Sequence, residues 1–308
     1  MNSQPLFVSV VFSVWHITAE TQRRLRPRKK DLVRESGTSE AKRKQIAKIM
    51  GARLRFSWRL FWILFVAAIV GILGAVPAGL ELFGSVLATA ESPPLPVPVL
   101  ILIGAIQNLI LLGLFVGIGL VLSAKIGLGA EYTQAWLDGE FDSSQLWKAF
   151  RFGFLGGLLV GGVLLPLIIV LANYLPNLPF VTAAKIPIWK RALMCLYGGF
   201  YEEIFCRLFL LSLFAWLINR SWRKVQKLSS GAFWAANLTA AVLFGLGHLP
   251  SVSLVMPITP LVVGAALVLN GFAGLVFGWL FRIRGLETAM IAHFTADVVL
   301  WIIGPEFL

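Results

Sequence analysis

Hydrophobic residues occur in long unbroken runs along this chain rather than in an alternating pattern. A helix that crosses a bilayer needs about 20 consecutive apolar residues, whereas a membrane β-strand alternates apolar and polar positions over only ~10 residues. Seven runs suit a helix, and they cover approximately Phe56–Leu87, Val99–Leu122, Phe152–Leu175, Ala192–Leu217, Gly231–Leu249, Met256–Phe281 and Leu286–Ile303. The pattern therefore predicts an all-α fold: a polytopic transmembrane helical bundle of about seven spans.

Two of these runs contain residues that can interrupt a helix. The first is long enough to bend at Pro77, and Glu81 beyond that proline is then expected near the membrane interface. The sixth contains Asn270-Gly271, so it is either one tilted helix or two pieces that meet there.

Composition agrees with a membrane protein. The chain has 308 residues and a mass of 33.8 kDa, with 58% hydrophobic residues, 14% charged residues and a mean hydropathy of +0.82. Soluble domains have roughly 45–50% apolar and ~25% charged residues. These values exclude an ordinary soluble enzyme, and they also exclude a disordered chain, which needs low hydrophobicity.

The positive charge is concentrated before the first span. Between Glu20 and Arg59 there are 14 Lys and Arg against 4 Asp and Glu, which leaves about +2 of the net +12 for all other residues. We therefore predict a basic, partly disordered or interfacial arm at 1–55 and a membrane domain at 56–308. Ser39–Met50 suits a short interfacial helix. Because the arm leads straight into a span, the expected partner is anionic lipid headgroups and not nucleic acid.

The basic loops also predict an orientation. With seven spans and a cytoplasmic N-terminus, the arm, Arg220–Lys227 and Arg282–Arg284 share one side of the membrane, as the positive-inside rule requires. The three basic residues of Asn173–Arg191 then fall on the other side and fit less well. The expectation is a multi-pass protein of the plasma membrane.

Charged residues inside a span are costly, so each one indicates a function. The first cluster holds Glu202, Glu203 and Arg207. Glu203 and Arg207 are four residues apart and share a helix face, so they can pair. Glu202 is rotated by ~100° from Glu203 and has no local partner. A desolvated carboxylate without a partner suits a general base near neutral pH.

Two further clusters carry histidines. His248 follows Phe244 by four residues near the end of the fifth run, and His293 precedes Asp297 by four residues in the last run. Each cluster alone has a simple structural explanation, such as a histidine bonded to a neighbouring helix. Together they put carboxylates and histidines on three apolar helices, which predicts one shared polar site.

The predicted membrane depths of these residues are the main argument against a single shared site. From the predicted span ends, Glu202 lies near mid-membrane, His248 nearer the outer face and His293 nearer the inner face. At 1.5 Å per residue the spread is roughly 10–20 Å. A common site therefore requires tilted, broken or shifted helices.

The motifs Glu202-Glu203-x-x-x-Arg207, Phe244-x-x-x-His248 and His293-x-x-x-Asp297 occur in this order along the chain. The ordered set resembles the CPBP family, which holds the CAAX-type prenyl-protein proteases and the bacteriocin-processing (Abi) proteins. The resemblance covers about residues 150–304. It implies an intramembrane endopeptidase that acts on membrane-associated substrates, for example prenylated or bacteriocin-like ones.

The resemblance also implies roles for the site residues. Glu202 and His248 would activate a water molecule, His293 and Asp297 would stabilise the oxyanion, and Glu203 and Arg207 would hold these groups in place. Peptide hydrolysis needs such a base and such stabilisation. The family often has Asn where this chain has Asp297, and an ionised Asp cannot donate a hydrogen bond.

Three explanations of that aspartate stay open: it is protonated by burial, it orients His293, or the site binds a metal. A metal-free mechanism is favoured and no cofactor is expected, because the sequence lacks H-E-x-x-H, the usual zinc helix. Zinc is the alternative, and its ligands would be Glu202, His248, His293 and Asp297. Cys195 and Cys206 do not have metal-site spacing.

Other functions remain as alternatives. A small-molecule transporter also has polar groups at mid-membrane depth, but it predicts an internal repeat, which the sequence lacks. A member of the same family could act without catalysis, as an immunity protein or a scaffold.

Overall fold

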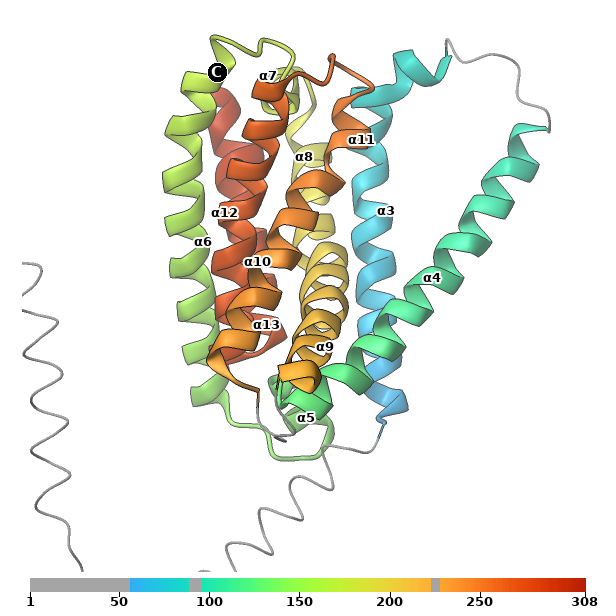
Figure 1. Cartoon of the computed structure of the whole chain (residues 1–308). Helices are drawn as coiled ribbons and strands as arrows, with labels where there is room; N and C mark the ends of the chain where they lie inside the picture. The colour runs from blue at the N-terminus through green and yellow to red at the C-terminus, as the bar shows by residue number, and fades with distance from the viewer. Residues whose placement is uncertain (1–55, 89–95, 223–227) are drawn as a thin grey trace, which may run out of the picture. The chain divides into compact units, whose positions relative to one another are not determined.

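The computed structural model describes residues 56–88, 96–222 and 228–308 (Figure 1). Every regular element in these ranges is a helix, and six of the helices are long and apolar enough to cross a membrane. The predicted arm at 1–55, with its helix at Ser39–Met50, lies outside the described residues. The division of the chain into arm and membrane domain therefore stays a prediction.

The long helices match the predicted runs in order. They are α3 (Trp58–Ala88), α4 (Val97–Ile126), α6 (Ser143–Ala172), α10 (Ser230–Gly247), α12 (Pro260–Arg284) and α13 (Leu286–Asp297), which continues into η3 (Val298–Ile303). A further, composite helix corresponds to the fourth run and consists of α8 (Ile188–Leu196), η1 (Tyr197–Glu202), η2 (Ile204–Leu211) and α9 (Ser212–Trp222). With the composite helix the predicted all-α, multi-pass fold is confirmed.

Short helices mark the two ends of the bundle. Figure 1 places α7 (Pro179–Ala183), α11 (Leu249–Val252) and the C-terminus, preceded by η4 (Gly304–Phe307), at one end, here called the α7 end. The opposite end, here called the α5 end, holds α5 (Glu131–Leu137) and the last turns of α9. The site described below is best located relative to these two ends.

The two runs with internal breaks form continuous helices. Helix α3 extends through Pro77 to Ala88, and Glu81 on it forms an ion pair with Lys190 of α8. Helix α12 continues through Asn270-Gly271, and the Asn270 side-chain amide donates to the Ala266 carbonyl of the same helix at 3.1 Å. Of the two possibilities for the sixth run, the single helix is therefore present.

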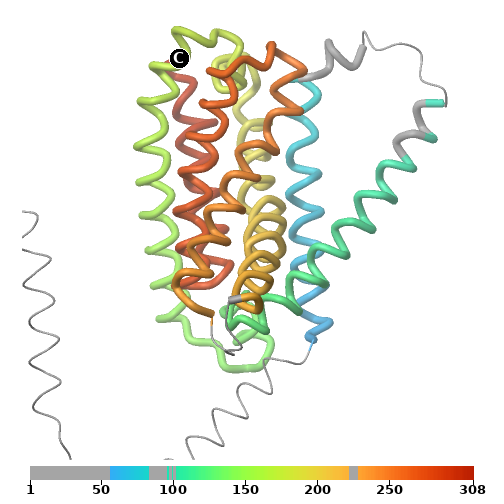
Figure 2. The backbone as a smooth tube through the Cα atoms, viewed as in Figure 1, coloured from blue at the N-terminus to red at the C-terminus, as the bar shows by residue number. Residues whose placement is uncertain are grey.

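Glycines let α6 and α13 approach closely. Gly153, Gly157 and Gly161 recur every four residues along one face of α6, and a Cβ added at Gly153 would lie 2.7 Å from the Thr288 carbonyl of α13. Figure 2 shows the two helices running side by side. In a membrane, where lipid competes for apolar surfaces, such small-residue faces are a main source of helix packing. Packing against this glycine face of α6 holds α13, which carries His293 and Asp297, in position.

The α5 end of α13 is held by a buried carboxylate. Glu287, in the first turn of α13, accepts hydrogen bonds from the Thr133 backbone N–H and from the Thr133 hydroxyl, both at 2.7 Å. The Leu286 backbone N–H also donates to the Gly129 carbonyl at 3.0 Å. Helix α5 is thereby joined to the start of α13.

Candidate functional site

The composite helix departs from α-helical geometry where the first polar cluster lies. Both η1 and η2 are π-helical, and Glu203 sits between them. Ser212, the first residue of α9, donates its hydroxyl to the Arg207 carbonyl at 3.2 Å, so it satisfies a backbone acceptor at the end of the π-helical stretch. Such π-helical turns are rare and often occur at functional sites. The hydrophobic and charge patterns did not predict these turns.

Glu203 is the buried centre of the arrangement. Its carboxylate is fully buried, and its Oε1 lies 3.0 Å from Nη1 of Arg207 and 2.7 Å from Nδ1 of His293. The ion pair expected from the four-residue spacing is therefore present. A carboxylate that pairs with a guanidinium accepts hydrogen bonds, so Nδ1 of His293 is the donor and its Nε2 faces the other way.

Arg207 is enclosed as tightly as its partner. Its guanidinium lies between the rings of Phe244 and Phe277, 5.1 and 5.4 Å from their centroids, and Nη2 donates to the Gly274 carbonyl at 3.3 Å. Cation–π contacts of this kind gain strength when they are desolvated. Phe277 also stacks on the His293 ring, with centroids 4.7 Å apart. The pattern of charged residues did not identify Phe277.

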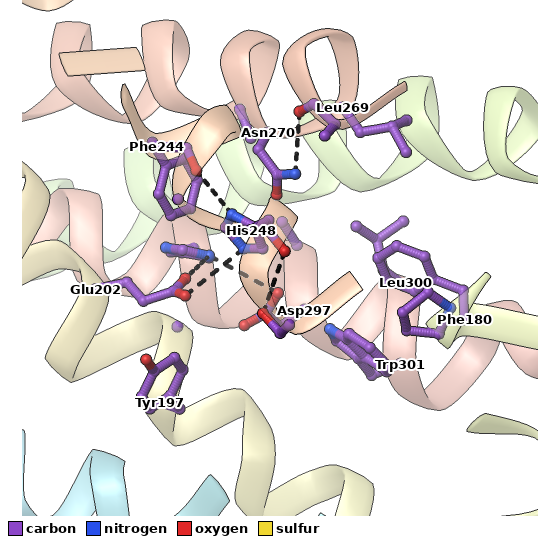
Figure 3. Close-up of a pocket in the computed structure, with 18 of the residues that line it drawn as sticks. Phe180, Tyr197, Glu202, Phe244, His248, Leu269, Asn270, Asp297, Leu300 and Trp301 are labelled. Carbon is purple, nitrogen blue, oxygen red and sulfur yellow. Dashed lines mark hydrogen bonds and ion pairs between the residues drawn. The ribbon is translucent and has the colours of Figure 1, made fainter. Parts of the chain in front are cut away.

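Glu202 points into a cavity (Figure 3), which Glu203 does not line. Its Oε1 lies 3.8 Å from Nε2 of His248, and its Oε2 lies 3.5 Å from Nε2 of His293. Oδ1 of Asp297 lies 3.8 Å from the same His293 nitrogen. Residues from three different helices thus converge on one point.

His248 ends α10 and has a fixed ring orientation. Its Nδ1 is 2.7 Å from the Phe244 carbonyl, which can only accept, so Nδ1 carries the proton and a neutral ring has its lone pair on Nε2. The Phe244 ring meets the His248 ring edge to face at 4.8 Å. Phe244 therefore has a packing role, and the Nε2 lone pair faces Glu202.

The depth problem raised by the sequence is resolved by the course of the helices. Helix α10 runs obliquely across the bundle from the α5 end toward α11 (Figure 1). The π-helical turns of the composite helix alter the turn geometry on both sides of Glu203. The six predicted site residues, Glu202, Glu203, Arg207, His248, His293 and Asp297, consequently form one connected cluster.

Gly198 is a site residue that the sequence analysis missed. A Cβ added there would overlap the Asp297 carboxylate and would lie 2.9 Å from Nε2 of His293. Only a glycine one helical turn before Glu202 leaves room for these side chains. The Gly198-Gly199 pair beside the acidic motif was a usable signal for this close approach.

The cavity beside the cluster has a volume of about 630 Å³ and is mostly apolar. Glu202, His248, His293 and Asp297 line it, whereas Glu203 and Arg207 lie behind its wall. Tyr197 and Tyr201, which stack at 5.0 Å along the composite helix, also line it. The arrangement places two carboxylates and two imidazoles at the edge of a chamber suited to an apolar chain segment.

The donor set of the alternative zinc site contains suitable chemistry, namely two imidazoles and two carboxylates. Within the described part of the chain, however, no group of three or more His, Cys, Asp and Glu side chains is arranged to hold a metal ion. Among the four candidate ligands, Nε2 of His293 lies 3.5 Å from Oε2 of Glu202 and 3.8 Å from Oδ1 of Asp297, and Nε2 of His248 lies 3.8 Å from Oε1 of Glu202.

In the comparison with protein-family models, residues 184–299 match the family described as Type II CAAX prenyl endopeptidase Rce1-like. The matched stretch begins before Gly198 and ends after Asp297, so it contains all six predicted site residues. Comparisons with curated proteins and with solved structures find no match. The resemblance drawn from the three motifs is thereby confirmed.

Proposed function

Since residues 184–299 form a domain of the Rce1-like type II CAAX prenyl endopeptidase family, we propose that this protein is an intramembrane endopeptidase that uses a water molecule activated by Glu202 and His248. The observation that carries the proposal is the position of Glu202. Its carboxylate lies between the Nε2 atoms of two histidines, at the edge of an apolar cavity.

The first step is attack by water on the scissile carbonyl carbon. The 3.8 Å between Glu202 Oε1 and His248 Nε2 exceeds a direct hydrogen bond, and a water molecule can bridge such a separation. Glu202 takes one proton as the water oxygen bonds to the carbonyl carbon. The proton then passes to the amide nitrogen, and the C–N bond breaks to give a carboxylic acid and an amine.

His293 supports this step from the opposite side of Glu202. With Nδ1–H donated to Glu203, a doubly protonated ring presents Nε2–H to the oxyanion of the tetrahedral intermediate. The Glu203–Arg207 pair orients this ring, which corresponds to the role of the aspartate behind a catalytic histidine. Asp297, 3.8 Å from Nε2, holds the ring from the cavity side.

The proposed substrate is a membrane-associated peptide or protein. An apolar cavity of about 630 Å³ beside the acid suits a segment that arrives from the lipid phase. A prenylated or bacteriocin-like chain has that character. We further propose that the protein resides in the plasma membrane with a cytoplasmic N-terminus, and that the basic arm contacts anionic headgroups.

The decisive test is cleavage of a panel of fluorogenic, membrane-partitioning peptides by purified protein. Wild type is compared with Glu202→Gln and with Glu140→Gln, which changes an exposed carboxylate at the α5 end. Activity that is lost only in Glu202→Gln supports the proposal. No cleavage by folded wild type would instead favour a non-catalytic member of the family, or the transporter.

A further inference from the structure

The cavity beside Glu202 extends toward the α7 end of the bundle. Its outer lining comes from Leu178 and Phe180 around α7, from Ser251 and Val252 of α11, and from Leu82 of α3. His248 lies on this side, and with 33% of its side chain exposed it is the most accessible of the candidate site residues. Glu202 follows at 16%, so accessibility falls from the α7 end inward.

The opposite end is closed by side chains. Among the described residues, the cavity lining includes none from α5 or α9, nor from 123–151 or 282–286. Between the site and the α5 end lie the buried Glu203–Arg207 pair and the fully buried rings of Phe233 and Phe281, near the ends of α10 and α12. A chain that reaches Glu202 therefore does not enter from the α5 end.

Basic residues identify which end faces the cytoplasm. Helix termini and loops at the α5 end carry seven of them: Arg59, Lys125, Lys148, Arg151, Arg220, Arg282 and Arg284. The α7 end carries Lys185, Lys190 and Arg191. In the sequence, 13 further Lys and Arg at 20–55 precede α3, and α3 starts at the α5 end (Figure 1). By the positive-inside rule the α5 end is cytoplasmic.

We infer that the active-site cavity opens on the non-cytoplasmic face of the membrane, and that the substrate is a peptide segment exposed on that face. This rests on the proposed endopeptidase function and specifies its substrate class. Exported polypeptides and the outward-facing segments of membrane proteins are then possible substrates. Of the two substrate types proposed above, an exported, bacteriocin-like peptide is therefore retained and the cytoplasmic tail of a prenylated protein is excluded, because the α5 end offers that tail no path to Glu202.

Cysteine labelling tests the orientation. Ser251 is exposed at the cavity mouth, and Ser143 is exposed at the start of α6, at the α5 end. Ser251→Cys and Ser143→Cys are expressed separately in cells and treated with a membrane-impermeant maleimide before and after permeabilisation. Wild type supplies the background, since both native cysteines are buried. We expect Ser251→Cys to be labelled in intact cells and Ser143→Cys only after permeabilisation. The reverse pattern overturns the inference.

Sealed vesicles test the substrate side. A soluble, impermeant peptide that the purified enzyme cleaves is added to right-side-out and to inside-out vesicles. Cleavage only by right-side-out vesicles supports the inference, and cleavage only by inside-out vesicles overturns it. If the purified enzyme cleaves no peptide of the panel, the proposed function fails and the substrate class with it. The labelling pattern then still decides the orientation independently.

Discussion

Oε1 of Glu203 lies 2.7 Å from Nδ1 of His293, although the two residues are 90 positions apart in the chain. The same oxygen pairs with Arg207 at 3.0 Å. One buried carboxylate therefore balances a cation and orients the imidazole of His293. Its neighbour Glu202 faces the cavity. These two adjacent acids are expected to respond very differently to substitution.

We expect Glu202→Gln to abolish cleavage without loss of folding. The amide keeps the shape of the side chain but cannot take a proton from water, so kcat should fall by about 10²–10⁴-fold, the usual contribution of a general base. Single-turnover cleavage and thermal unfolding in detergent measure the two effects. Glu140→Gln is the matched control, and an equal loss of activity there would show that the effect is not specific to the site.

Glu203→Ala should primarily destabilise the protein. Removing one partner of a buried ion pair leaves an uncompensated charge, here on Arg207, and costs about 3–5 kcal/mol of unfolding free energy. Denaturant unfolding in detergent measures it. The double variant Glu203→Gln with Arg207→Met removes both charges and should recover part of that stability. It should remain inactive, because the neutral amide at position 203 no longer provides the negative charge that stabilises a doubly protonated His293 ring. Full stability of Glu203→Ala alone would contradict the assignment.

Gly198→Ala should impair activity more than stability. The added methyl group would displace the Asp297 carboxylate and Nε2 of His293, and a displacement of about 1 Å at reacting groups can reduce the rate by ~10²-fold. Gly162→Ala is the control, since a Cβ at Gly162 meets no atom within 4 Å. The comparison uses kcat at saturating peptide concentration, and equal rates for the two variants would contradict the prediction.

Gly157→Ala tests the seam between α6 and α13. A Cβ at Gly157 would press into the Ala292 carbonyl and Thr295, so the two helices must separate. Overpacking of this kind typically costs about 1–3 kcal/mol. Unfolding midpoints of Gly157→Ala and Gly162→Ala, two alanines on the same helix, measure the difference directly. A midpoint at or above that of Gly162→Ala would mean that the close approach is not required.

Chelators should leave cleavage intact. Because the proposed steps use only Glu202 and the histidines, activity after dialysis against EDTA or phenanthroline should equal that of the untreated enzyme, and purified protein should contain zinc well below one atom per chain. Loss of activity that zinc restores would establish the alternative ligand set of Glu202, His248, His293 and Asp297.

Sequence patterns were sufficient for the parts of this protein that depend on local spacing. Hydrophobic runs gave the spans, and the four-residue spacing of Glu203 and Arg207 gave their pair. The structural features that these patterns did not predict depend on contacts between segments distant in the chain. The π-helical turns, the oblique course of α10 and the stacking of Phe277 on His293 follow from packing across the bundle, which has no signature within one segment. For the same reason, the sequence placed the three motifs at different membrane depths, although the structure brings them together.

The different roles of Glu202 and Glu203 predict which of the two residues is retained during evolution. A lineage that abandons proteolysis can lose Glu202 and still inherit a folded bundle, whereas loss of Glu203 removes the counter-charge of Arg207 and endangers the fold. Homologues that have lost proteolytic activity should accordingly keep Glu203 and Arg207, whereas the residue at position 202 should vary among them. Among descendants of this scaffold, the identity of the residue at position 202 would then separate working peptidases from proteins that have kept only the architecture.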